Sequence, residues 1–216
     1  MKTKLIIAAL VCALSINAAR AETQGSLGVM HTSDYYYRGA QLSQDALQFN
    51  VGVDTTVSGL GVSLGYFTNQ ASEDTNTDIL SLDISKSILD KTLTLAAGVY
   101  NMDTDGTPDL TEAYVGVSAN VLLNPSIKLF RDVSDNLYTC EVGVSHKFDL
   151  QVADLTVGGA FGRTELTDTT ERDYTTLRAR LSKSFDNVTP HVQVAVVDSD
   201  AMDSETVLCL GVDFKF

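Results

Sequence analysis

Three histidines and one nearby serine are the side chains of this 216-residue chain best suited to nucleophilic chemistry. His31 and Ser33 lie two positions apart, and in a strand both would face the same side, as the base and nucleophile of a lipid hydrolase must. That spacing places them roughly 7 Å apart, too far for a hydrogen bond. His146 and His191 are expected on opposite faces of their strands, so neither completes a pair. We therefore expect no enzyme activity and no catalytic residue.

One acidic segment has the start of a metal-binding pattern. Asp103-Thr104-Asp105-Gly106 is similar to the beginning of a calcium loop, in which carboxylates alternate along the chain. The third acid and the closing glutamate of such a loop are missing at the required spacing. Acid-rich segments of this kind attract divalent cations diffusely. We expect no specific metal site and no cofactor.

The elements that position these side chains follow a period of two residues, which is the period of a half-buried β-strand. In the segment 46–55, Leu47, Phe49, Val51 and Val53 alternate with polar residues or glycine. The same alternation predicts twelve strands, over residues 26–32, 46–55, 61–67, 79–86, 93–100, 113–121, 126–131, 138–148, 155–161, 177–185, 191–197 and 208–216.

The connections between these strands alternate between long and short. The long connections cover residues 34–45, 69–78, 102–110, 132–136, 164–173 and 198–205, and tight joins lie between them. This alternation is typical of outer-membrane β-barrels, whose periplasmic turns are short and whose extracellular loops are longer. We predict an all-β fold, an antiparallel transmembrane β-barrel of about 12 strands. A soluble β-sandwich is the alternative.

The first 21 residues differ in kind from the rest. A positively charged start and an apolar run over residues 5–14 precede the small residues of Ala19-Arg20-Ala21. These are the parts of a secretory signal peptide. We predict cleavage after Ala21, with residues 1–21 as the signal peptide and residues 22–216 as a barrel exported to the cell outer membrane. No later run of roughly 18 apolar residues predicts a transmembrane helix.

The net charge of the chain is −13, from 28 acidic and 15 basic residues, which excludes nucleic acid as a partner. The signal peptide holds three of the bases, so the mature chain has 28 acids and 12 bases, a net −16. The six long connections contain 18 of these acids and only two bases, Arg38 and Arg172. The other 10 acids and 10 bases balance. The sequence therefore predicts an acidic rim above a charge-balanced barrel.

Apolar side chains of the predicted strands must face lipid, so residues of the opposite parity are expected to face the lumen. The candidate pore-lining residues are the acids Asp54, Asp83, Glu112, Glu141 and Asp213 and the bases Arg178 and Arg180, with Lys128, Lys147 and Lys215 beside them. By the same parity Cys140 faces lipid and Cys209 faces the lumen, so we expect two free thiols. Twelve strands are intermediate in width, which leaves open whether the lumen conducts.

A motif follows the first predicted strand. Ser33, Tyr35, Arg38 and Gly39 have the spacing Ser-x-Tyr-x-x-Arg-Gly, and a stretch rich in Gln and Ser comes next. This motif resembles the N-terminal signature of the TorF-type porins. The resemblance implies a Gram-negative outer-membrane barrel of about this length and does not imply a particular solute. The chain also ends on Phe216, a terminal aromatic residue that the outer-membrane assembly machinery accepts as a signal in this class of protein.

Arg38 is a rare base among the acids of the predicted loops, and its tyrosine neighbours can stack on its guanidinium. Two interpretations are open. Arg38 folds inward as a constriction or solute-binding charge, or it pins the first loop to acids of the rim. The second is the interpretation favoured here.

The function expected from these patterns is passive diffusion of small solutes through a porin with an acidic, cation-favouring mouth. The alternative is a non-conducting structural or adhesive barrel whose acidic loops bind lipopolysaccharide or partners through divalent cations. Outer-membrane lipids, lipopolysaccharide and the assembly machinery are the expected partners. No interface signal predicts an oligomeric state.

Overall fold

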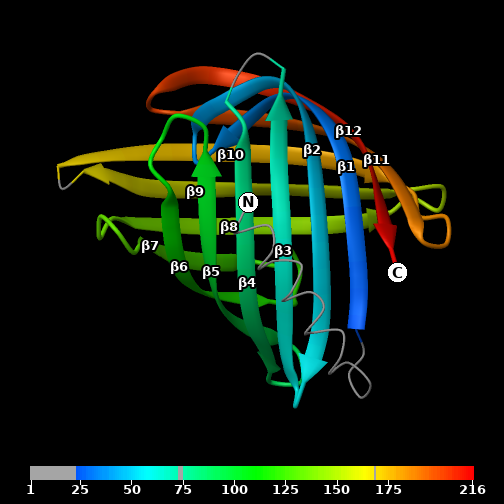
Figure 1. The fold of residues 1–216 in the computed structure, drawn as a ribbon. Coiled ribbons are helices and arrows are strands. Elements are labelled where there is room, and N and C mark those ends of the chain that lie inside the picture. Colours follow the sequence, from blue (N-terminus) through cyan, green and yellow to red (C-terminus); the bar gives the residue numbers. More distant parts are fainter. Residues whose placement is uncertain (1–22, 73–74, 168) are drawn as a thin grey trace.

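The computed structural model describes residues 23–72, 75–167 and 169–216, and the predicted signal peptide lies outside these residues. Twelve antiparallel strands of the described chain form one closed barrel (Figure 1), which confirms the predicted fold. The strands are β1 (Thr23–Tyr37), β2 (Ala40–Val57), β3 (Leu60–Ala71), β4 (Thr77–Ile88), β5 (Leu93–Thr104), β6 (Leu110–Ala119), β7 (Ser126–Asp132), β8 (Tyr138–Asp149), β9 (Asp154–Thr167), β10 (Thr170–Ser182), β11 (Val188–Ser199) and β12 (Met202–Lys215). Within these ranges no helix is long and apolar enough to cross a membrane.

The barrel closes between its first and last strands. β1 pairs with β12 in antiparallel register, with Val29 opposite Val212. The terminal residue extends this seam, because the Phe216 N–H donates to the Gly25 carbonyl at 2.9 Å and the Gly25 N–H donates to the Phe216 carbonyl at 3.1 Å. Closure leaves the sheet without an unpaired edge, which is what a sheet surrounded by lipid requires.

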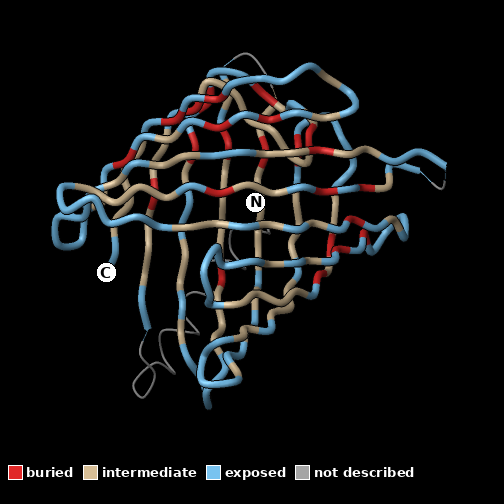
Figure 2. The backbone as a smooth tube through the Cα atoms, turned by 180° about the vertical axis from the view of Figure 1, so that it is seen from behind, coloured by how far each residue is buried: buried red, intermediate tan, exposed pale blue. Residues whose placement is uncertain are grey.

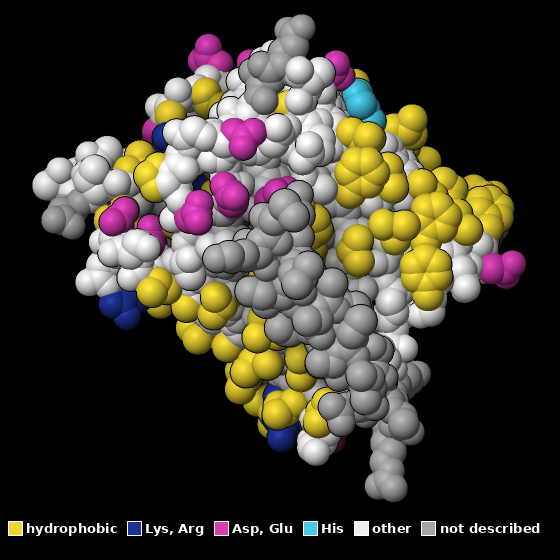
Figure 3. Space-filling view, viewed as in Figure 1, with side chains coloured by type: hydrophobic (Ala, Val, Ile, Leu, Met, Phe, Trp, Pro, Cys, Tyr) yellow, Lys and Arg dark blue, Asp and Glu magenta, His cyan; other side chains and the backbone are white. Residues whose placement is uncertain are grey.

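The outer surface of the wall is apolar. Large hydrophobic side chains stand out at alternate positions, such as Leu82 and Ile84 on β4 and Leu208 and Leu210 on β12, which are between 46% and 68% exposed. In Figure 3 hydrophobic side chains cover much of the lower and right-hand wall, and acidic side chains lie mainly toward the upper and left-hand edges. An apolar surface this extensive is the kind that lipid covers.

Several strands are longer than the ranges predicted from the alternation of apolar residues. We call the rim formed by the β1–β2, β3–β4, β5–β6, β7–β8, β9–β10 and β11–β12 connections the loop rim, and the opposite rim the terminus rim. On the loop rim β1 and β2 meet at residues 38–39, and β11 and β12 meet at residues 200–201. Most of the predicted loops 34–45 and 198–205 is therefore strand. These hairpins continue their pairing beyond the apolar belt, where no lipid imposes the alternation.

The interior is filled mainly toward the loop rim. Buried residues gather at that end of the strands (Figure 2). Several of them are polar, including Thr32, Asn69, Thr77, Glu112 and Thr139. Because buried polar groups need hydrogen-bond partners, this end of the barrel is where a network of side chains is expected.

Candidate functional site

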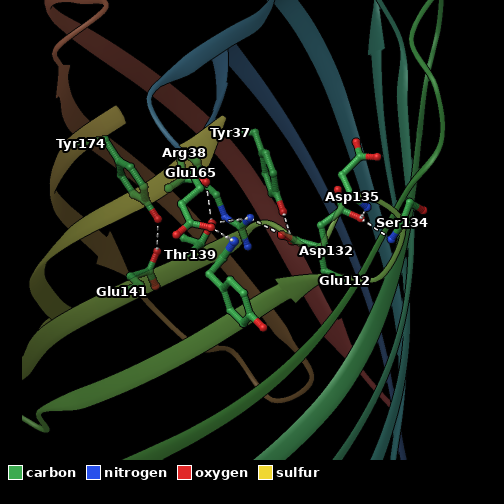
Figure 4. Close-up of polar contacts among 12 residues, drawn as sticks. Tyr37, Arg38, Glu112, Asp132, Ser134, Asp135, Thr139, Glu141, Glu165 and Tyr174 are labelled. Carbon is green, nitrogen blue, oxygen red and sulfur yellow. Dashed lines mark hydrogen bonds and ion pairs between the residues drawn. The ribbon is translucent and has the colours of Figure 1, made fainter. Parts of the chain in front are cut away.

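The tip of the β1–β2 hairpin lies inside the barrel. Its two turn residues, Arg38 and Gly39, both have positive φ, 50° and 73°. That is the conformation of a type I′ turn, whose twist matches a tight hairpin. A register shift between Tyr35 and Tyr36 precedes the turn, and β-bulges of this kind bend a strand. Figure 4 shows the resulting position of Arg38 among side chains of the barrel interior.

Arg38 forms an ion pair with Glu112 on β6. β1 and β6 are five strands apart in the twelve-strand wall, so this pair crosses the lumen. Glu112 also accepts a hydrogen bond from the Tyr37 hydroxyl at 2.7 Å, and Arg38 Nη1 donates to Thr139 Oγ1 at 3.2 Å. The Arg38 and Glu112 side chains are only 11% and 5% exposed. Because little water reaches them, each of these two charges is stabilised mainly by the other and by their hydrogen bonds.

Aromatic rings surround the Arg38 guanidinium. Its Cζ lies 4.5 Å from the centre of the Phe130 ring and 4.9 Å from that of Tyr37, within cation–π range. Phe130 packs in turn on Tyr114, with ring centroids 5.5 Å apart. Burial acts to lower the pKa of Arg38, but Tyr37 and Glu112 raise it above its ordinary value. The guanidinium therefore stays charged.

Gly39 fixes the hairpin tip on a second side. The Ser199 hydroxyl of β11 donates a hydrogen bond to the Gly39 carbonyl at 3.0 Å. A Cβ atom at Gly39 would lie 2.7 Å from Cβ of Ser199 and 2.8 Å from Cβ of Tyr174. The positive φ and this close approach together require glycine. The tip is thus held both by Glu112 and by the β10–β11 wall.

The hairpin tip lies between two cavities of the interior. The outer cavity, of about 220 Å³, lies on the loop-rim side, and the inner cavity has about 470 Å³. Tyr37, Arg38 and Glu112 line both cavities, and we call these three residues the constriction. A further cavity of about 280 Å³ shares Lys128 and Glu141 with the inner cavity and reaches the β6–β7 turn on the terminus rim. The inner cavity and this further cavity therefore lie next to each other, between the constriction and the terminus rim.

Three of the candidate pore-lining acids lie near the constriction or the inner cavity. Glu112 belongs to the constriction itself. Asp83 accepts a hydrogen bond from the Tyr114 hydroxyl at 2.5 Å, and Glu141 accepts one from the Tyr174 hydroxyl at 3.0 Å. Tyrosine hydroxyls thus satisfy Asp83 and Glu141, for which the described part of the chain supplies no basic partner within hydrogen-bond reach.

The other candidates lie closer to the terminus rim. Arg178 lines the cavity of about 280 Å³. Arg180 pairs with Asp213, and its Nη2 lies 3.0 Å from His191 Nδ1. Asp54 is apart from them and lines a separate cavity of about 490 Å³. The structure therefore brings Arg180 and Asp213 together, and leaves Asp54 apart.

The motif residues have distinct structural roles. The Ser33 hydroxyl accepts a hydrogen bond from the Leu208 N–H at 3.0 Å across the barrel seam. Tyr35 packs on Phe67 with ring centroids 5.5 Å apart. The remaining two residues form the hairpin turn. The motif therefore describes the hairpin that enters the lumen, from its base to its tip.

The residues considered for catalysis do not form a catalytic pair. His31 Nε2 lies 2.8 Å from Asp45 Oδ1 on the exposed surface, away from any base–nucleophile contact with Ser33. Cys140 is exposed and Cys209 is buried, and both are free thiols. Across the described residues, no group of three or more His, Cys, Asp or Glu side chains is placed to hold a metal ion.

Sequence reasoning missed the hydroxyl and aromatic partners of the constriction. Thr139 accepts a hydrogen bond from Arg38, and Phe130 stacks on the same guanidinium. Tyr174 donates a hydrogen bond to Glu141, which lines the inner cavity together with Glu112. One signal was available: Tyr114 has the same parity as Glu112, and a bulky aromatic residue at a lumen-facing position indicates a filled interior.

The barrel resembles known porins in fold. The chain matches no protein-family profile and no curated protein. It is similar to a KdgM porin in complex with disordered oligogalacturonate, with a TM-score of 0.62 and 16% identity over 88% of this chain and 99% of that one. It is also similar to the NanC porin (TM-score 0.59, 14% identity, 88% and 100% covered). A third is the COG4313 outer membrane channel from Pseudomonas putida F1 (TM-score 0.58, 11% identity, 90% and 95% covered). These likenesses show the fold, and the resemblance to TorF-type porins in particular stays a prediction.

Proposed function

We propose that the protein is an outer-membrane channel for passive diffusion of small solutes, narrowed by the constriction at its loop rim. The observation that carries the proposal is a series of neighbouring interior cavities, from Glu112 to the terminus rim, with charged side chains in their walls, inside a closed barrel with an apolar exterior. A wall of this kind is stable with lipid outside and water inside. The shared fold with porins supports the same function.

The proposed path for solutes passes residues of both charge signs. Asp83, Glu112 and Glu141 are proposed to line the part of the lumen near the constriction, and Arg178, Arg180, Asp213 and Asp54 the part closer to the terminus rim. The terminus rim is proposed to face the periplasm. The predicted signal peptide, residues 1–21, is proposed to direct export, and Phe216 is proposed to act as a signal for the assembly machinery.

The mouth of the channel is proposed to favour cations. The predicted loops hold 18 acids against Arg38 and Arg172, and Arg38 is already neutralised by Glu112. Such a rim concentrates cations and repels anions over a distance of about 8 Å at physiological ionic strength.

Conductance in planar bilayers tests this proposal. We expect refolded protein to give discrete current steps, with a cation preference at about 0.1 M salt that weakens at about 1 M. Heat-modifiable gel mobility establishes in the same sample that the barrel is folded. A folded barrel that gives no current overturns the channel function.

A non-conducting structural or adhesive barrel is the second candidate. The constriction favours it, because Tyr37, Arg38 and Glu112 separate the outer from the inner cavity. In this function the acidic loops bind lipopolysaccharide or partner molecules through divalent cations. Binding to lipopolysaccharide vesicles that is lost with a chelator, from a folded barrel without conductance, is the result that selects it.

A further inference from the structure

Both bases of the predicted loops line the same outer cavity. Arg38 is fully engaged there by Glu112, Thr139 and the aromatic rings described above. Arg172 on β10 is different, because its Nε is buried and has no hydrogen-bond partner within the described chain. Leaving a buried donor of a charged group unpaired is costly. A guanidinium in this condition at a cavity wall is suited to a ligand with a carboxylate.

Two carboxylates also line this cavity, Asp132 at the end of β7 and Glu165 on β9. Asp132 is buried, and its Oδ1 accepts hydrogen bonds from backbone N–H groups at 2.7 and 3.3 Å. Glu165 Oε2 accepts one from the backbone N–H of Tyr138 at 2.8 Å. Each carboxylate uses one oxygen in these bonds, and the second oxygen accepts none within the described residues. These oxygens can receive the donors of a ligand ammonium group.

The rest of the cavity wall is largely apolar. Four leucines contribute to it, namely Leu42, Leu110, Leu137 and Leu166. The volume of about 220 Å³ equals that of roughly seven water molecules at about 30 Å³ each. This room suits a solute of amino-acid size and excludes an oligomer.

We propose that the outer cavity binds a small zwitterion with an apolar side chain, a free amino acid of about leucine size. Its carboxylate binds Arg172, its ammonium binds the buried Asp132, and its side chain packs against the leucines. β7 and β10 are three strand intervals apart, about 14 Å along the wall, a span that the Arg172 side chain and such a solute cover together.

The charge of the loop rim favours a zwitterion over a simple anion. The predicted loops have a net charge of −16, which repels a free carboxylate ion. A zwitterion has no net charge and brings its carboxylate past the rim. The inference that this zwitterion is also transported rests on the channel function proposed above. Binding of the zwitterion in the outer cavity needs no open channel.

Equilibrium binding of L-leucine to the refolded barrel, followed by calorimetry in detergent, tests the inference. We expect saturable binding, at least tenfold weaker for leucine methyl ester and for N-acetyl-leucine, which each lack one of the two charges. Arg172→Gln should weaken leucine binding at least tenfold. Arg163→Gln is the matched control, because Arg163 lies on the exposed surface of the adjacent strand, where it pairs with Asp173 at 2.6 Å. It removes the same charge without touching the cavity.

Leucine that fails to bind the folded wild-type barrel overturns the site. So does Arg172→Gln with wild-type affinity, or an ester that binds as well as leucine. Asp132→Asn provides a second variant if Arg172→Gln does not fold, and it should weaken leucine binding while leaving N-acetyl-leucine binding unchanged. Leucine binding without conductance would remove the channel function and keep the site, whereas conductance without leucine binding would do the reverse.

Discussion

The guanidinium of Arg38 and the carboxylate of Glu112 meet across the lumen, although they are 74 residues apart in sequence and five strands apart in the wall. This contact gives Arg38 both of the roles considered for it, the anchoring of the first hairpin and the narrowing of the lumen. The residue does pin the first hairpin, but to an acid inside the barrel instead of one on the rim, and by doing so it narrows the interior. The strength of one buried ion pair therefore sets how firmly the hairpin tip is held.

Replacing Glu112 with Gln should release the hairpin tip. The buried Arg38 would lose its counter-charge, and we expect the free energy of unfolding to fall by about 3 kcal/mol. Single-channel conductance should rise, because the tip is no longer held across the lumen. Urea unfolding and bilayer currents measure the two effects. Glu141→Gln is the control, since Glu141 accepts a hydrogen bond from Tyr174 and does not hold the hairpin; a folded Glu112→Gln barrel with unchanged conductance would contradict the expectation.

Gly39 should tolerate no side chain. Gly39→Ala would place Cβ within 2.8 Å of two other Cβ atoms at a φ of 73°. We expect a loss of about 2 kcal/mol or more in unfolding free energy, from strain and from overpacking together. Gly106→Ala has a similar φ of 80° but open space around it, so it should lose only about 1 kcal/mol. Equal losses in the two variants would show that the hairpin tip is not packed against Ser199 and Tyr174.

A charge on the outer wall should destabilise the barrel more than a charge in the lumen. Leu177 is 58% exposed on the outer face, and its neighbour Thr176 lines the inner cavity. Leu177→Arg should cost about 2 to 4 kcal/mol in a bilayer, and Thr176→Arg about 1 kcal/mol or less. Unfolding from lipid vesicles in urea measures this difference. Similar costs would mean that the outer wall does not face lipid.

Removing acids from the loop rim should weaken the cation preference. We expect the triple variant Asp103→Asn, Asp105→Asn, Asp109→Asn to shift the reversal potential toward zero at about 0.05 M salt and to match the wild type at about 1 M, where the Debye length is about 3 Å. Asp90→Asn with Asp186→Asn on the terminus rim is the control. If the control shifts the potential as much as the triple variant, the preference does not arise at the mouth.

The sequence predicted the wall of the barrel well, because lipid imposes a strict alternation on it. Leu82 and Ile84 must point outward for the chain to be stable in a bilayer, and that requirement is visible in single residues. Parity also placed Glu112 and Glu141 on the inner side of their strands, next to the cavities.

The hairpin that enters the lumen could not be predicted in the same way. The sequence predicts a loop at Gln41, Ser43 and Gln44, because these polar residues give no alternation of apolar and polar side chains. In the structure they belong to a strand. The direction of the hairpin depends on a bulge at Tyr35 and on partners far along the chain, and neither leaves a periodic signal. That Arg172 Nε has no hydrogen-bond partner among the described residues is likewise visible only in the folded cavity.

The position of the hairpin has a consequence for the order of assembly. β1 and β2 are the first strands synthesised, but the anchor of their turn, Glu112, lies on β6, and Ser199 comes only at the end of β11. Contacts of such long sequence separation form late, after the intervening chain has been ordered. The β1–β12 seam that closes the wall joins residues still further apart in sequence, such as Ser26 and Lys215, so we expect the hairpin tip to be docked inside the sheet before the seam seals.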